Sequence, residues 1–243
     1  MLRRFWRCLG GVSAVILSVG LTGCGADGAP QAVGRVVDRA ADADVAAPAR
    51  SEPDRGPLLV ALGDSLTAGL GLDPAQAYPA LLEQQLRAEG VDLTVVNAGV
   101  SGDTTAAGLR RAEWSLDGDV RFLIVALGGN DGLRGLPAAQ MKQNLAAILS
   151  LAKSRDIPVL LAGMEAPPNF GAIYTTQFRD VFRELAAEHD VSFMPFLLVG
   201  VAGEPGLNQA DGIHPNAEGA QIVATRVREA LEPLLPLGAV ATQ

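Results

Sequence analysis

Short apolar runs alternate with amphipathic segments between about residue 58 and residue 235. Five runs have the length of single strands: 58–62, 93–97, 122–127, 158–162 and 191–195. The first is apolar enough to be buried on both faces, 122–127 is the most apolar, and 191–195 is the weakest strand signal. Apolar residues at helical spacing predict helices at 75–89, 103–114, 138–154 and 216–232, and one that ends near residue 189. A turn is expected at 128–132 and a long loop at 164–172. This alternation predicts an α/β fold in three layers, with a five-stranded parallel sheet between helices and right-handed crossovers.

The first residues follow a different pattern. Three arginines precede an apolar stretch at residues 9–21, which has the length and charged flank of a secretory signal peptide. The stretch ends in Leu21-Thr22-Gly23-Cys24, which resembles the lipobox of bacterial lipoproteins. That resemblance implies that residues 1–23 are removed and that Cys24 receives a lipid, so the protein would be anchored to a membrane and not span it. The alternative is an ordinary secretory signal in which Cys24 is incidental.

The remaining chain divides by composition. Residues 24–56 are rich in Ala, Gly, Pro, Asp and Arg and lack periodicity, which predicts a flexible tether after the cysteine. Residues 57–236 form the predicted domain, and 237–243 a short tail. We see no second domain and no internal repeat. The expected location is the cell envelope, either lipid-anchored on the periplasmic face of a bacterial membrane or free in the periplasm.

Composition narrows the classes of function. Of 243 residues, 49% are hydrophobic, which is enough for a sizeable core, and the formal net charge is −8. A chain this acidic, with no Lys/Arg cluster in its body, is not expected to bind nucleic acid. Two histidines and two cysteines cannot build a Cys/His zinc site of the usual spacing, so no metal is expected.

The first strand leads into the segment from Gly63 to Gly69, Gly-Asp-Ser-Leu-Thr-Ala-Gly. If a helix follows this strand, Ser65 lies at the carboxyl edge of the sheet beside unpaired backbone N–H groups. That environment favours developing negative charge, as a nucleophile or an oxyanion requires. The alternative is that Asp64 or Ser65 serves only as a helix N-cap.

Other loops at the same edge supply the partners that ester or thioester cleavage needs. His214 can exchange a proton with Ser65 near neutral pH, and Asp211, three residues earlier, can hold the far ring nitrogen. The N–H groups of Ser65 and Gly102 and the side-chain amide of Asn130 are candidate oxyanion donors. Each of these residues could serve only as a turn or cap when taken singly. The second histidine, at 189, is expected at a solvated helix end.

These motifs resemble those of the GDSL, or SGNH, hydrolases. Four blocks occur in order between about residues 58 and 235, and the four letters of SGNH fall on Ser65, Gly102, Asn130 and His214. Further similarity around Ser101–Thr104 and Leu127–Gly135 is to the bacterial branch that contains acyl-CoA thioesterase I, lysophospholipase and arylesterase. The resemblance implies a flavodoxin-like sheet, a nucleophile at Ser65, a base at His214, an orienting carboxylate at Asp211 and no cofactor.

The expected substrate is a small-molecule or lipid ester. Apolar residues in the loops after the fourth and fifth strands predict a groove for a medium or long acyl chain: Met164, Pro167, Phe170, Ile173, Tyr174 and Leu197. The alternative is that these residues only cover the end of the sheet. Rival functions are a cell-envelope carbohydrate O-deacetylase of the same family, a nucleotide or flavin binding module and a non-catalytic binding lipoprotein. The binding module is disfavoured because the first loop lacks a phosphate-binding glycine signature and carries Asp64.

Overall fold

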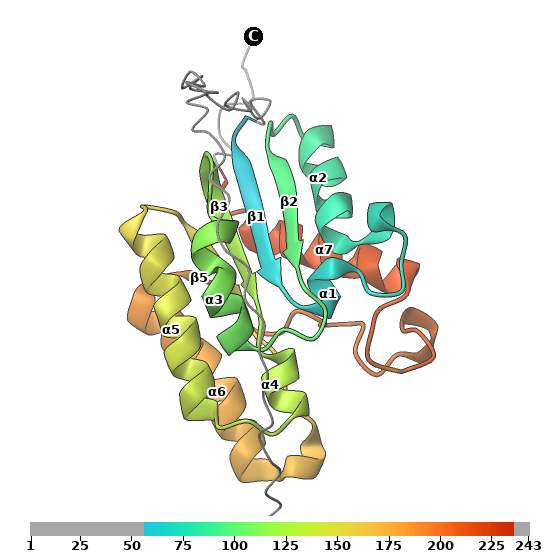
Figure 1. The fold of residues 1–243 in the computed structure, drawn as a ribbon. Helices are drawn as coiled ribbons and strands as arrows, with labels where there is room; N and C mark the ends of the chain where they lie inside the picture. The colour runs from blue at the N-terminus through green and yellow to red at the C-terminus, as the bar shows by residue number, and fades with distance from the viewer. Residues whose placement is uncertain (1–55, 236–243) are drawn as a thin grey trace, which may run out of the picture. The chain divides into compact units, whose positions relative to one another are not determined.

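A computed structural model describes residues 56–235 of the chain. The predicted signal peptide, Cys24 and the C-terminal tail lie outside the described residues. A single five-stranded sheet organises this part of the chain, with all strands parallel and in the order β2-β1-β3-β4-β5 (Figure 1). Its strands are β1 (Leu58–Gly63), β2 (Thr94–Gly99), β3 (Val120–Ala126), β4 (Val159–Ala162) and β5 (Ser192–Met194). This order is that of the flavodoxin-like folds, which confirms the predicted fold class.

Helices cover both faces of the sheet, as the strand order and right-handed crossovers require. One layer contains α2 (Tyr78–Ala88) and α7 (Ala217–Leu231), which pack together (Figure 1). The other contains α3 (Thr105–Ser115), α5 (Ala138–Ser154) and α6 (Ala172–His189), with α5 between its two neighbours. All six residues of β1 are buried, because this central strand is covered on both faces. None of the helices in the described part of the chain is long and apolar enough to cross a membrane.

Two predicted elements differ from the structure. The helix expected at 75–89 is interrupted, because a short 3₁₀ turn at Pro74–Gln76 precedes α2 and the residue between them, Ala77, is extended. Pro79 explains the break: proline lacks an N–H and is tolerated in the first turn of a helix, so α2 begins at Tyr78.

The segment expected to be a turn at 128–132 contains a short helix, α4 (Gly129–Leu133). Asp131 in this helix is buried, and its carboxylate accepts hydrogen bonds from the backbone N–H of Thr105 at 2.8 Å and from the Thr105 hydroxyl at 2.6 Å. The Thr105 hydroxyl in turn accepts a bond of 3.0 Å from the Asn144 amide. These contacts fix α4 against α3 and α5, so long-range bonds that local sequence does not reveal stabilise this single turn.

Candidate active site

Ser65 is the first residue of α1 (Ser65–Ala68), directly after the carboxyl end of β1. The tight change of direction requires a glycine at position 63, because a Cβ there would lie 1.9 Å from the Thr67 hydroxyl oxygen. Asp64 caps the helix by accepting a hydrogen bond of 3.0 Å from the Leu66 N–H. The N-cap function considered from the sequence therefore belongs to Asp64 and leaves the Ser65 hydroxyl unused by the cap.

His214 lies on the loop before α7 and reaches back to the first loop. Its Nε2 is 2.8 Å from Ser65 Oγ, and its Nδ1 is 2.6 Å from Asp211 Oδ2. The backbone N–H groups of His214 and Ile213 donate to Asp211 Oδ1, and these bonds, followed by the one to the imidazole, lower the pKa of Asp211 to about 2. The ionised carboxylate accepts the Nδ1 proton, so Nε2 of the neutral ring can accept the proton of Ser65. The three side chains thus form the relay that a serine nucleophile needs.

Gln209 joins the two loops that carry the serine and the histidine. Its side-chain amide donates to the carbonyl of Leu70 at 2.7 Å and to that of Pro215 at 2.9 Å, and its backbone N–H donates to the His214 carbonyl at 2.8 Å. Gln209 was not among the residues predicted from the sequence, since a single glutamine in a loop shows no pattern.

The three predicted oxyanion donors lie around one cavity, which Ser65, Gly102 and Asn130 all line. Gly102 has a φ of +87°, which favours glycine, and neither its N–H nor that of Ser65 bonds to another part of the described chain. Asn130 Nδ2 donates to the Asp103 carbonyl at 3.0 Å and to Asp64 Oδ2 at 3.3 Å. Both amide hydrogens are therefore engaged, and the longer contact with Asp64 is the one that an oxyanion can replace.

The cavity has a volume of about 730 Å³ and extends from Ser65 along the loops after β4 and β5. Of the six residues predicted to form an acyl groove, Met164 and Pro167 line it. Phe170, Ile173, Tyr174 and Leu197 do not line it. Leu197 is buried in the core, and the Tyr174 hydroxyl donates to the Leu136 carbonyl at 2.7 Å.

The described residues contain no group of three His, Cys, Asp or Glu side chains that could hold a metal ion.

Comparisons with known proteins agree with this geometry. The sequence pattern of the GDSL-like Lipase/Acylhydrolase family matches residues 61–222. The chain belongs to this family.

Esterase TesA of Pseudomonas aeruginosa is 45% identical over 178 residues, which are 73% of this chain and 89% of the relative. Thioesterase 1/protease 1/lysophospholipase L1 of Escherichia coli is 39% identical over 178 residues, or 73% of this chain and 84% of the relative. The crystal structure of AlinE4, an SGNH-hydrolase family esterase, shares 46% identity and a TM-score of 0.63 over 74% of this chain and 97% of that one. The protein is a serine ester hydrolase of the SGNH type.

Asp64 is a buried carboxyl group beside the serine of this acylhydrolase. Its side chain is 2% exposed, and burial raises its pKa to about 6 although hydrogen bonds from Leu66 and Asn130 act in the opposite direction. From the sequence, Asp64 was expected as a possible helix cap and as a charge that disfavours phosphate binding. Its contact with Asn130 could not be read from the sequence, because 66 residues separate the two.

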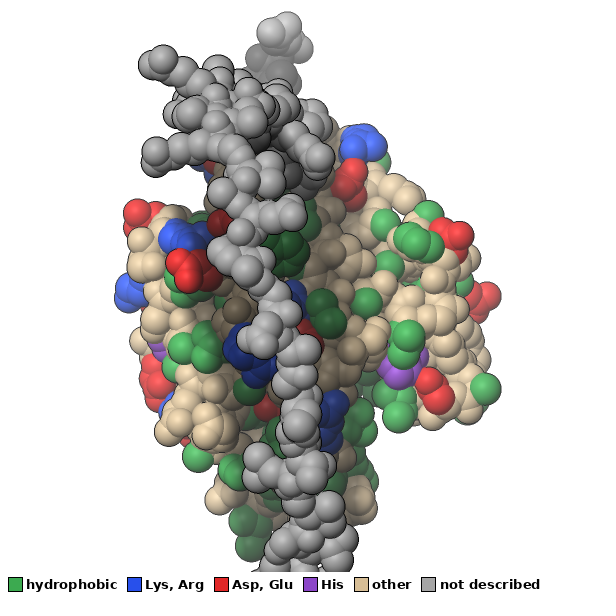
Figure 2. Space-filling model, viewed as in Figure 1, with side chains coloured by type: hydrophobic (Ala, Val, Ile, Leu, Met, Phe, Trp, Pro, Cys, Tyr) green, Lys and Arg blue, Asp and Glu red, His purple; other side chains and the backbone are tan. Residues whose placement is uncertain are grey.

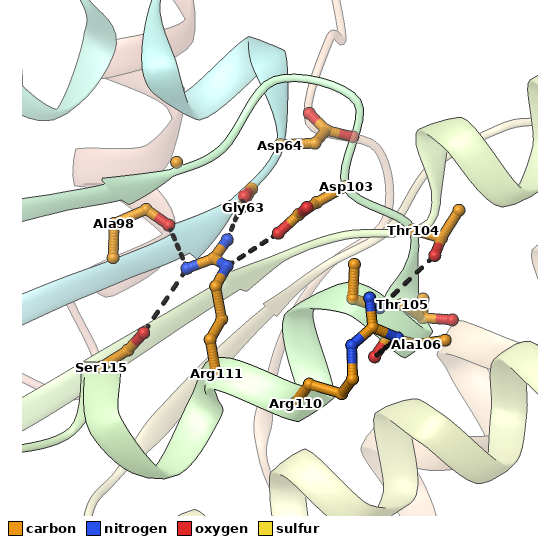
Figure 3. A network of polar contacts seen from close by, with 12 residues as sticks. Gly63, Asp64, Ala98, Asp103, Thr104, Thr105, Ala106, Arg110, Arg111 and Ser115 are labelled. Atoms are coloured by element: carbon orange, nitrogen blue, oxygen red, sulfur yellow. Dashed lines mark hydrogen bonds and ion pairs between the residues drawn. The ribbon is translucent and has the colours of Figure 1, made fainter. Parts of the chain in front are cut away.

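Arg111 of α3 bonds the segments next to Ser65 and Gly102, two of the candidate oxyanion donors (Figure 3). One guanidinium nitrogen, Nη2, donates to the Gly63 carbonyl at 2.7 Å, and Nη1 donates to the Ala98 carbonyl at 2.8 Å. Nε bonds the Asp103 carboxylate at 2.7 Å, in an ion pair whose side chains are only 18% and 14% exposed. One planar side chain thus ties the ends of β1 and β2 to the residue that follows Gly102.

Arg111 was also not among the residues predicted from the sequence. A usable signal exists, because Asp103 precedes α3 and Arg111 lies eight residues later, close to two helical turns, on the same side of the helix. The sequence does not show that the other two guanidinium nitrogens donate hydrogen bonds to backbone carbonyl groups at the ends of two strands.

We expect Asp64→Asn to change how stability depends on pH. In the folded chain Asp64 has a pKa of about 6, against an ordinary value of 3.8, so its ionisation lowers the free energy of unfolding as pH rises from about 4 to about 8. A difference of about two pKa units corresponds to about 3 kcal/mol. The free energy of unfolding of the variant, measured in urea relative to that of the native chain, should therefore rise by about 3 kcal/mol between about pH 4 and about pH 8. Asp119→Asn, at a half-exposed aspartate, serves as the control, and a pH-independent difference for Asp64→Asn would contradict the argument.

We expect Arg111→Lys to lower kcat about tenfold to a hundredfold while KM changes little, because a lysine cannot bond all these acceptors and the oxyanion donors lose their alignment. Arg110→Lys is the matched control, since the neighbouring Arg110 is exposed and, among residues 56–235, bonds only the Ala106 carbonyl of its own helix (Figure 3). Steady-state kinetics at a temperature where circular dichroism shows both variants folded would test this. An unchanged kcat for Arg111→Lys would contradict the positioning function.

Proposed function

We propose that this esterase cleaves carboxylic esters and thioesters through an acyl-enzyme formed on Ser65. The 2.8 Å contact between Ser65 Oγ and His214 Nε2 is the observation that carries the proposal. Esters and thioesters are both included because the relatives named above are an esterase and a thioesterase/lysophospholipase.

The reaction follows from the hydrogen bonds. Ser65 Oγ attacks the acyl carbon as its proton passes to His214 Nε2, and Asp211 stabilises the imidazolium that forms. The oxyanion accepts hydrogen bonds from the Ser65 and Gly102 N–H groups and from Asn130, which gives up its contact with Asp64. His214 then protonates the leaving alkoxide or thiolate. Water enters, gives a proton to His214 and releases the carboxylic acid, and the proton returns to Ser65.

We further propose that the cavity holds an apolar acyl chain. Met164, Ala166 and Pro167 on the β4 side and Phe196 and Leu198 on the β5 side line it. An acyl chain placed between these loops leaves water, and each buried methylene contributes about 0.8 kcal/mol.

We also propose that the mature chain begins at a lipidated Cys24 and works in the cell envelope. The apolar segment at 9–21 and the lipobox-like Leu21–Cys24 support this, and both lie outside the described residues. Metabolic labelling with a palmitate analogue, compared between the native chain and Cys24→Ser, would test the attachment.

Active-site labelling tests the nucleophile. A fluorophosphonate probe should label the native chain and not Ser65→Ala. His214→Ala should lower kcat/KM by about 10⁴- to 10⁶-fold, and the double variant should be little worse because the two residues act as a unit. His189→Ala, which changes the other histidine at the C-terminal end of α6, is the control and should keep its activity. Clear additivity of the Ser65 and His214 losses would overturn the assignment.

A series of p-nitrophenyl esters from acetate to decanoate tests the acyl cavity. We expect kcat/KM to rise by up to about fourfold per added methylene until the cavity is filled. A maximum at acetate, together with release of acetate from an acetylated glycan, would instead favour the carbohydrate O-deacetylase considered from the sequence.

A further inference from the structure

The large hydrophobic side chains that remain exposed are concentrated at one edge of the described domain. There are nine such residues in the described part of the chain, and eight of them lie in the loops, the short helix α4 or the first turn of α6, close to the carboxyl ends of the strands. We call these eight the apolar rim: Leu70, Val100, Leu133, Leu136, Phe170, Ile173, Val199 and Ile213. The ninth, Trp114, lies in α3. Isolated exposed hydrophobic residues are ordinary, but their confinement to one edge is not expected by chance.

Part of the rim borders the active-site cavity. Leu70, Leu133 and Ile213 themselves line the cavity, and Val100 and Val199 are each next in sequence to a residue that does. Segments that follow all five strands contribute residues to the rim, so the rim does not belong to one segment of the chain. Figure 2 shows hydrophobic side chains at the lower end of the molecule, which is the end occupied by α4 in Figure 1.

One corner of the rim is firmly supported. The ring of Phe170 packs on Tyr174, Tyr174 on Phe178 and Phe178 on Phe182, with centroids 5.5, 6.0 and 5.7 Å apart. Phe178 and Phe182 belong to the core, so this aromatic row connects the rim to the interior. Ile173 projects from this supported corner with 79% of its surface exposed.

We infer that the apolar rim docks on the surface of a zwitterionic lipid bilayer and that the acyl substrate enters the cavity directly from the lipid. A protein seated on the rim would close the entrance, whereas a lipid surface covers the same side chains and supplies an apolar acyl chain. Two exposed acidic residues, Glu165 and Asp211, and one exposed basic residue, Arg134, lie at the same edge. Because the chain also carries a net charge of −8, its electrostatic field disfavours an anionic surface. The inference rests on the proposed function for its substrate.

The length of chain before the domain permits this arrangement. Thirty-one residues lie between Cys24 and Gly56, and a segment of that length reaches at most about 110 Å. A compact domain of this size is about 40 Å across. A lipid on Cys24 would therefore leave the domain free to turn the carboxyl edge of its sheet, opposite the start of β1, toward the membrane.

Two substrates separate docking from catalysis. We would compare the native full-length chain, Ile173→Ser/Val199→Ser and Trp114→Ser on soluble p-nitrophenyl butyrate and on lysophosphatidylcholine in phosphatidylcholine vesicles. Neither Ile173 nor Val199 lines the cavity, and Trp114, at 74% exposure, matches Ile173 outside the rim. The rim variant should lose about tenfold or more on vesicles and keep its rate on the soluble ester, while Trp114→Ser should keep both. Equal losses on both substrates, or none, would overturn the inference.

Tryptophan fluorescence measures contact with the lipid independently of catalysis. The chain has two tryptophans, so Trp6→Phe leaves Trp114 as the only one, and Trp6→Phe/Trp114→Phe/Ile173→Trp places the only one on the rim. Nitroxide-labelled phosphatidylcholine vesicles should quench the emission at 173 and not that at 114. Absence of quenching at 173 overturns docking on lipid and leaves a protein as the occupant. If Ser65 is not labelled and no ester is cleaved, the proposed function fails. The fluorescence measurement still shows whether the apolar rim docks on lipid.

Discussion

The hydrogen bond between Ser65 and His214 is the contact on which the rest of the site depends. It joins residues 149 positions apart, from the loop after the first strand and the loop before the last helix. A parallel sheet makes the meeting possible, because the carboxyl ends of all strands share one edge. Gln209 maintains it, since one side chain bonds both the segment after α1 and the segment that follows His214. The imidazole is therefore held by its own loop and by the neighbouring one.

Two carboxylates near this contact have opposite environments and opposite pKa shifts. Asp211 is half-exposed and accepts two backbone N–H groups, so its pKa falls to about 2 and the group stays charged. Asp64 is enclosed between α1 and Asn130, and burial raises its pKa to about 6. The two carboxylates differ in their partners accordingly: Asp211 bonds the imidazole of His214, and Asp64 caps α1 and accepts a hydrogen bond from Asn130, a proposed oxyanion donor. A buried carboxylate with a raised pKa destabilises the fold at neutral pH, which is typical of residues retained at an active site.

Hydrogen bonds from Arg111 to backbone carbonyl groups stabilise the segments that carry the proposed oxyanion donors. Arg111 bonds the last residue of β1 and the end of β2, and through Asp103 it reaches the loop that carries Gly102. Asp103 also accepts a hydrogen bond from Asn130, so the three proposed donors share one connected set of contacts. Donors held in this way need little reorganisation when charge develops, which is the physical basis of oxyanion stabilisation. The apolar rim continues the same edge outward, so catalysis and the proposed lipid contact both depend on loops that one sheet brings together.

The sequence by itself determined the parallel sheet, and it predicted the edge at which the candidate site lies and the serine, histidine, aspartate, glycine and asparagine that form it. These follow from short apolar runs, glycine-bounded turns and motifs whose residues act through their own chemistry. Only the tertiary structure decided how Asn130 divides its hydrogens between Asp64 and Asp103, and that Arg111 spans two strand ends. It also decided that Met164 and Pro167 face the cavity while Ile173 lies on the outer rim. Such features depend on side chains from distant segments and on burial, which local sequence patterns do not encode.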